Sequence, residues 1–338
     1  MSVGLDVGSK TIKMVELTSH GGAYVLKASG IVGHKGKKPE FTKEDKELVP
    51  LVEAIKKLHK DAKFSSKEVS LALPESHVFT RTIKFPLLTD NEIASAVKWE
   101  AEQYIPIPIN EAIVQHQIIE RREDTSPAQV IVLLVASPRA LVEKYARVGE
   151  MSGLNLISVE TELISLIRSL APEDQTVLIA DFGARSTNIA ISKNAMITFS
   201  RSIPTAGEAF TRSVAQALGI EEVQAEEYKR SYGLSPTQLE GKIKGALDPI
   251  LRMVSDEMKK AVHFYQSEEK GEAPKSVILA GGSAGMPEMA SSLTKLLGIE
   301  VIVGNPFSKV SVDPQAVQAL SGYAPLYSVA VGLAMRES

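Results

Sequence analysis

The chain of 338 residues contains no cysteine, and its longest unbroken apolar run is only Val130–Ala136. Without cysteine there are no disulfides, no thiolate metal sites and no cysteine nucleophiles. The six histidines form no HxxxH or HExxH pair, which argues against a zinc enzyme. A membrane-spanning helix needs roughly 20 apolar residues, so we expect no direct membrane insertion. The net charge of −3 offers no general attraction for nucleic acid or an anionic membrane.

The two ends of the sequence show no targeting or anchoring pattern. A strand pattern begins at Val3, which leaves no room for a signal peptide, and no basic amphipathic tail follows Arg336. We therefore expect a cytoplasmic protein. A chain of this length is long enough for two sizeable cores.

Two segments of the sequence share one pattern. Residues 3–17 read VGLDVGSKTIKMVEL, and residues 178–191 read LIADFGARSTNIAI. Each is an apolar strand that runs into Asp-x-Gly, then small and hydroxyl residues, then a second apolar strand. The aligned pairs, at a constant offset of 175 residues, are Asp6 and Asp181, Gly8 and Gly183, and Lys13 and Asn188. A hairpin repeated about half a chain apart predicts two related lobes that face each other.

Two facing glycine hairpins can hold a polyphosphate. Phosphates need backbone N–H donors brought close, which calls for glycine, and Mg²⁺ needs carboxylates, usually through water. Asp6 and Asp181 are the metal candidates, and Lys10 is a candidate phosphate contact. The other candidates for binding the nucleotide phosphates are Gly8, Ser9 and Thr11 on the first hairpin, and Gly183, Ser186 and Thr187 on the second. The first hairpin is not a Walker A loop, because Ser9 separates its glycine from its lysine.

Two further segments fit a nucleotide site. On a predicted helix, Glu226 and Lys229 lie three residues apart on one face and could meet a ribose and adenine. Residues 277–283 read as a buried strand that runs into the turn Gly281-Gly282-Ser283. Alone, the first is an ordinary charged helix face and the second a common strand-to-helix turn. Together with the hairpins, in this order, they predict a nucleotide cleft.

The middle of the sequence predicts a separate α+β module inserted into the first lobe. Thr89-x-x-Glu92 is a capping box for a helix with Ile93, Val97 and Ala101 on one face, and two strands and a helix follow it. The predicted units are residues 1–77 and 154–174 for the first lobe, 78–153 for the module, 175–215 and 274–338 for the core of the second lobe, and 216–273 for its helical part.

The sequence also predicts the local structure at three other places. We expect Trp99, the sole tryptophan, to belong to the core of the module. The polar stretch His34–Lys46 reads as a solvated surface loop. The helical region 237–269 is expected to break near Pro249.

In order and spacing, the four segments resemble the phosphate-1, phosphate-2, ribose and adenosine motifs of the actin, DnaK and sugar-kinase superfamily, and the inserted module stands where FtsA has one. More specific segments are Phe85-Pro86-Leu87, Glu92-Ile93, residues 99–108 (WEAEQYIPIP), Glu111 and Gln115-His116-Gln117. They resemble the PilM family, whose pattern EAExYIPFP…DEV…DYQ is matched with Ile107 for Phe and His116 for Tyr. The resemblance extends from Val3 to Leu333 and implies an α/β, two-lobed actin-like ATPase fold.

The resemblance to PilM implies a scaffold in type IV pilus assembly. Such a protein would bind ATP or ADP with Mg²⁺ between its lobes. Its partner would be the cytoplasmic N-terminal tail of the inner-membrane protein PilN, and through PilN it would meet PilO. The pilus motor ATPases are further partner candidates, and the protein would be recruited to the inner membrane only through its partner.

The resemblance also suggests where a water-orienting acid would lie. Chaperones and FtsA place one at the start of the helix after the inserted module, which here gives Glu162, with Glu160 as a nearby alternative. A helix N-terminal acid is also explained by the helix dipole alone. The second hairpin reads Gly-Ala-Arg-Ser from Gly183 where many superfamily members have Gly-Gly-Gly-Thr, so we expect at most slow hydrolysis. The alternatives left open are a small-molecule kinase and an FtsA-like filament-forming protein.

Overall fold

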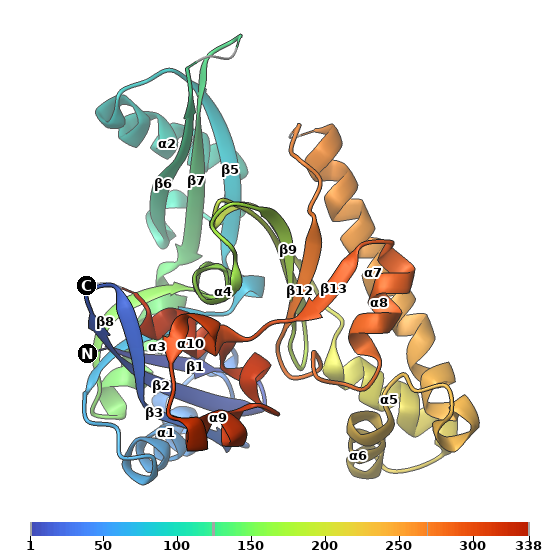
Figure 1. Cartoon of the computed structure of the whole chain (residues 1–338). Helices are drawn as coiled ribbons and strands as arrows, with labels where there is room; N and C mark the ends of the chain where they lie inside the picture. Colours follow the sequence, from blue (N-terminus) through green and yellow to red (C-terminus); the bar gives the residue numbers. More distant parts are fainter. Residues whose placement is uncertain (1, 124–125, 269, 337–338) are drawn as a thin grey trace.

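The computed structural model describes residues 2–123, 126–268 and 270–336. It contains two lobes, each built on its own sheet, and a three-stranded module that rises above the first lobe (Figure 1). This is the predicted two-lobed α/β architecture. None of the described helices is long and apolar enough to cross a membrane.

The first sheet has the strand order β14-β3-β2-β1-β4-β8. Its strands are β1 (Ser2–Val7), β2 (Thr11–His20), β3 (Ala23–Gly33), β4 (Glu68–Leu73), β8 (Asn155–Thr161) and the short β14 (Val310–Ser311). Helices α1 (Val49–Asp61) and α3 (Arg139–Met151) contribute to the core cluster that contains residues of β1 and β4. Strand β1 is buried throughout from Val3, Asp6 included, as expected for a central strand covered on both faces.

The second sheet has the order β11-β10-β9-β12-β13. Its strands are β9 (Thr176–Phe182), β10 (Thr187–Lys193), β11 (Met196–Ile203), β12 (Ser276–Ala280) and β13 (Glu300–Val303). The helices of this lobe are α5 (Gly207–Leu218), α6 (Glu222–Tyr232), α7 (Lys242–Ser267) and α8 (Met289–Leu297). The expected break near Pro249 is absent, because α7 continues through it. Buried Leu247, Leu251 and Val254 hold the helix against the core and outweigh the missing hydrogen bond.

The module contains β5 (Phe79–Pro86), α2 (Asp90–Tyr104), β6 (Ala112–Arg122) and β7 (Gln129–Pro138), with strand order β5-β7-β6. Ile93, Val97 and Ala101 of α2 are buried, as the capping-box helix predicted. Trp99 lies on the opposite side of that helix and is 75% exposed, so its assignment to the core was wrong. Helix α3, placed in the module from sequence, packs its Tyr145 and Val148 into the core of the first lobe.

The C-terminal segment returns to the first lobe. After β13 come α9 (Pro314–Leu320) and α10 (Ser328–Ala334), and β14 pairs with β3 of the first sheet. Helix α10 is buried along its whole length against β1, β2 and α4 (Glu162–Leu170). The sequence had assigned residues 274–338 to the second lobe, and from β14 onward the structure differs. The apolar face of α10 finds its partners on β2, at Val15 and Leu17.

The remaining short 3₁₀ helices are η1 (Pro39–Phe41), η2 (Asp45–Leu48), η3 (Glu75–His77), η4 (Ile109–Glu111), η5 (Gln238–Gly241), η6 (Pro306–Lys309) and η7 (Ala324–Tyr327). Two of them fall in or next to the stretch His34–Lys46, which is exposed at Lys43–Lys46, as expected of a surface loop, but not at Lys38 and Pro39. Its Lys38 is 7% exposed and its Pro39 is buried. This segment therefore belongs to the wall of the first lobe.

Candidate functional site

The two hairpins of the sequence repeat have the same backbone geometry. The Gly8 N–H donates to the Thr11 carbonyl over 3.1 Å, and the Gly183 N–H donates to the Ser186 carbonyl over 3.1 Å. A Cβ atom added to either glycine would lie 2.9 Å from that same carbonyl oxygen. Both positions therefore require glycine, and the offset of 175 residues seen in the sequence holds in three dimensions.

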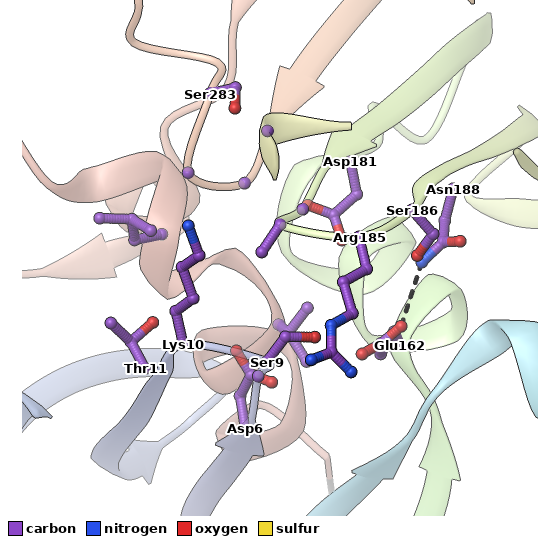
Figure 2. A pocket seen from close by; sticks show the side chains of 18 of the residues that line it. Asp6, Ser9, Lys10, Thr11, Glu162, Asp181, Arg185, Ser186, Asn188 and Ser283 are labelled. Atoms are coloured by element: carbon purple, nitrogen blue, oxygen red, sulfur yellow. Dashed lines mark hydrogen bonds between the residues drawn. The ribbon is translucent and has the colours of Figure 1, made fainter. Parts of the chain in front are cut away.

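The hairpins face one pocket of about 710 Å³ between the lobes (Figure 2). The predicted site residues that line it are Asp6, Gly8, Ser9, Lys10, Thr11, Glu162, Asp181, Gly183, Ser186, Glu226, Lys229, Gly281, Gly282 and Ser283. The exception is Thr187, which is fully buried and donates its hydroxyl hydrogen to the Thr205 carbonyl, 2.7 Å away. Side chains alternate along a strand, so Thr187 points away from the face that Ser186 and Asn188 present.

The two predicted metal-binding aspartates differ in their partners. Asp6 is buried, and the ammonium of Lys13, on the neighbouring strand, donates to its Oδ2 over 2.9 Å. The Asp181 carboxylate accepts no hydrogen bond and forms no ion pair within the described part of the chain. Burial and the nearby negative charges of Glu162 and Asp6 raise the pKa of Asp181 to about 7.

This arrangement suits a cation held through water. A positive charge between the aspartates would relieve the repulsion that raises the pKa of Asp181. No group of three or more His, Asp or Glu residues in the described chain is placed to bind an ion directly. Mg²⁺ commonly keeps several of its waters and takes only one or two carboxylates, so the pair fits that ion.

Glu162 faces the pocket at the start of α4, whereas Glu160 does not. Glu162 Oε2 accepts from the Asn188 amide at 3.1 Å, the bond drawn in Figure 2, and from the Glu75 N–H at 3.2 Å. Burial raises the pKa of the Glu162 carboxyl. Glu160 is tied by two hydrogen bonds to the guanidinium of Arg168 and lies outside the pocket. Of the two acids, only Glu162 is placed to act on a ligand.

Glu226 and Lys229 form a preorganised polar cluster on α6. The Lys229 ammonium donates to Glu226 Oε2 at 2.7 Å and to the hydroxyl of Thr211 at 3.0 Å. Burial opposes ionisation of Glu226, but hydrogen bonds from Lys229 and Thr211 outweigh it and lower its pKa to about 2. Across the pocket, the Lys10 ammonium lies 3.9 Å from Glu226 Oε2, so this cluster also links the two lobes.

The glycine turn after β12 packs closely against the second hairpin. Gly281 has φ of +85°, and a Cβ there would lie 2.2 Å from Asp181 Oδ1. The Ser283 N–H donates to the Phe182 carbonyl over 3.2 Å. Gly207, at the start of α5, approaches as closely, with its N–H 3.1 Å from the Gly183 carbonyl. Sequence reasoning missed Gly207, which also lines the pocket.

Several other lining residues were not singled out from sequence. They are Lys13, Lys38, Glu40, Phe41, Arg185 and Asn188. Lys13 and Asn188 were visible as an aligned pair, but their contacts to Asp6 and Glu162 require the folded sheets. Lys38 and Glu40 form a buried ion pair over 3.1 Å. Because both residues lie in a polar stretch of the sequence, their burial could not be predicted from it.

Two lobes around paired glycine hairpins, with carboxylates facing the pocket, define an actin-like ATPase fold. The chain belongs to the family described as type IV pilus assembly protein PilM, whose model matches residues 4–338. A solved structure titled PilM-PilN type IV pilus biogenesis complex is 28% identical, with a TM-score of 0.84, and the match covers 99% of this chain and 98% of that one.

Two further similarities concern fold relatives. The cell division protein FtsA of Bacillus subtilis is 24% identical over 64% of this chain, and the match spans 57% of the length of FtsA. A structure of MreB5 of Spiroplasma citri bound to AMPPNP is 13% identical with a TM-score of 0.57, covering 98% of this chain and 94% of that one. At this identity the likeness to MreB5 shows the fold alone.

Proposed function

We propose that this protein is an ATP-binding scaffold of type IV pilus assembly that holds the cytoplasmic N-terminal tail of PilN. The observation that carries the nucleotide part is the pair of equivalent hairpins, which place Gly8 and Gly183 on opposite sides of one pocket. Membership of the PilM family and the similarity to the PilM-PilN complex support the partner. We place the protein at the cytoplasmic face of the inner membrane, recruited by that tail.

The pocket offers a distinct group to each part of MgATP. Gly8 and Gly183 allow the backbone to approach the phosphates, and Lys10 supplies a positive charge. Asp6 and Asp181 would hold Mg²⁺ through its waters, and the ion would neutralise phosphate charge. Glu226 and Lys229 would meet the ribose and adenine. A solved fold relative, MreB5, carries AMPPNP.

We propose that hydrolysis is slow. Glu162, the acid placed to orient water, already accepts two hydrogen bonds at Oε2, from Asn188 and from the Glu75 backbone. The second hairpin also carries Ala184 and Arg185 where glycines would let backbone donors approach a phosphate. We expect turnover far below the roughly 10 s⁻¹ typical of enzymes.

The proposed peptide site is a groove of about 230 Å³ between the module and the second sheet. Its walls are β5 and β11, which are edge strands of their sheets, and Phe264 of α7. Phe79 and Phe199 give it an apolar lining. The Thr82 hydroxyl on β5 donates to the Thr198 carbonyl on β11 over 3.2 Å, so the two walls touch at that point. An extended peptide could add to the remaining backbone groups of these edge strands.

Calorimetry with a peptide that copies the PilN N-terminus tests the partner. We expect Phe199→Ser and Phe264→Ser to weaken peptide binding at least tenfold without changing ATP affinity, because apolar anchors would carry the binding. Val317→Ser, an exposed apolar position on α9, is the matched control. Unchanged peptide affinity in both groove variants would place the peptide elsewhere. Failure of wild-type protein to bind the peptide would refute the partner.

A further inference from the structure

The repeat that relates the two hairpins also relates two cations. At the offset of 175 residues, Lys10 on the first hairpin corresponds to Arg185 on the second. Both side chains line the same pocket, and they are 45% and 54% exposed. Each phosphate hairpin therefore carries one accessible positive charge at its turn.

Arg185 has only weak partners in this structure. Its Nε lies 3.7 Å from Glu208 Oε2, beyond hydrogen-bond distance. Its guanidinium also sits 5.5 Å from the ring centre of Phe41, which belongs to the first lobe and is half exposed. Contacts of this length at exposed sites hold a side chain loosely. Arg185 can therefore leave them for a stronger anionic ligand.

The direction of the side chain indicates which part of a nucleotide it would meet. In Figure 2, Arg185 extends from its hairpin into the pocket toward Asp6 and Glu162, and away from Ser283. Ser283 follows the glycine turn at the proposed adenosine end, and Glu162 marks the end where a terminal phosphate would lie. Lys10 reaches Glu226 in the proposed ribose region instead. The two equivalent cations therefore point to different parts of the pocket.

We infer that Arg185 binds the terminal phosphate of a nucleoside triphosphate and makes the pocket prefer the triphosphate over the diphosphate. A guanidinium can form two parallel charge-assisted hydrogen bonds to a phosphate, which backbone donors in this hairpin would otherwise supply. Its arrival at the phosphate would also break the contact with Phe41, so the lobes would then be joined through the ligand. This inference rests on the proposed nucleotide-binding function.

The test compares the affinities of AMPPNP and ADP, each with Mg²⁺, in wild-type protein and in Arg185→Met and Arg185→Lys. We expect Arg185→Met to lower AMPPNP affinity tenfold or more and ADP affinity less than threefold, and Arg185→Lys to retain part of the preference. Arg201→Met is the matched control, because Arg201 is similarly exposed, pairs with Glu257 at 2.6 Å and lies outside the pocket.

Equal losses for AMPPNP and ADP, or no loss for either, would overturn the assignment of Arg185 while leaving nucleotide binding intact. A wild-type protein that binds neither nucleotide would instead refute the proposed function itself. The wild-type measurement therefore separates the two failures.

Discussion

The two glycine hairpins share a backbone but not a charge balance. In the first, Asp6 is paired with the buried ammonium of Lys13, whereas in the second the corresponding position is Asn188, which bonds to Glu162 and leaves Asp181 without a partner among the described residues. The two turns have the same backbone geometry, which would admit a phosphate in the proposed function, and the lobes differ in the side chains around each turn. In the first hairpin the charge of Asp6 is balanced by Lys13 without any ligand. In the second hairpin the Asp181 carboxylate has no such partner among the described residues, so an added cation would stabilise it more.

The largest effects should follow from the feature that the hairpins share. We expect Gly8→Val and Gly183→Val each to lower ATP affinity more than a hundredfold, because the new side chain would fill the space that a phosphate needs beside the turn. Asp6→Ala should likewise abolish binding. Equilibrium titration with a labelled ATP analogue is the measurement, with circular dichroism to show that each variant is folded.

Gly245→Ala on the exposed face of α7 is the control, because a Cβ there meets nothing within 4 Å. It should leave ATP affinity unchanged. A large loss in only one of the two valine variants would break the equivalence of the hairpins.

Because only the first hairpin contains a buried ion pair, substitutions in the two hairpins should lower the free energy of unfolding by different amounts. Lys13→Met leaves Asp6 buried and unpaired, which should cost about 3–5 kcal/mol in the free energy of unfolding. Asn188→Ala removes only hydrogen bonds of an amide, with an expected cost of about 1–3 kcal/mol. Urea denaturation measures both.

The double variant Asp6→Asn with Lys13→Met should recover most of the loss, because no buried charge then remains. Equal losses of unfolding free energy for Lys13→Met and Asn188→Ala, with no recovery in the double variant, would contradict a stabilising role for the Asp6–Lys13 ion pair.

Glu75, the buried acid next to Glu162, should have a smaller effect, on how the free energy of unfolding depends on pH. Burial and the charge of Glu162 raise the pKa of Glu75 to about 7. The folded protein therefore holds the proton more tightly than the unfolded chain, and this contribution to stability is full below about pH 4.5 and is lost as the pH rises through 7. Unfolding in urea should become easier between pH 5 and pH 8.

Glu75→Gln should reduce that dependence without abolishing it, because the pKa of Asp181 is also raised to about 7. Glu53→Gln, at an exposed position on α1, should leave it unchanged. A slope that survives unaltered in Glu75→Gln would mean that other groups cause it.

Local patterns were the part of the site that the sequence could predict. The hairpins, the α6 acid and lysine and the turn at Gly281 are each encoded within a few residues, and all reach the pocket. Thr187 was predicted to line the pocket, but its side chain is buried on the other face of β10. Strand alternation was sufficient to predict this, because its counterpart in the first hairpin, Ile12, is a core residue.

Long-range packing was the part that could not be predicted. Nothing local shows that α10 returns to the first sheet or that Lys38 is buried beside Glu40. Trp99 is a different case, since the buried positions Ile93, Val97 and Ala101 already placed it on the other side of α2. Its helical spacing was sufficient to predict its exposure.

A crystal structure of the protein grown with AMPPNP and Mg²⁺ would test the proposed nucleotide cleft most directly. We expect density for the phosphates between Gly8 and Gly183, with the metal between Asp6 and Asp181 and the adenosine toward Gly281 and Ser283. A pocket that stays empty at saturating nucleotide, or nucleotide bound at another place, would contradict it.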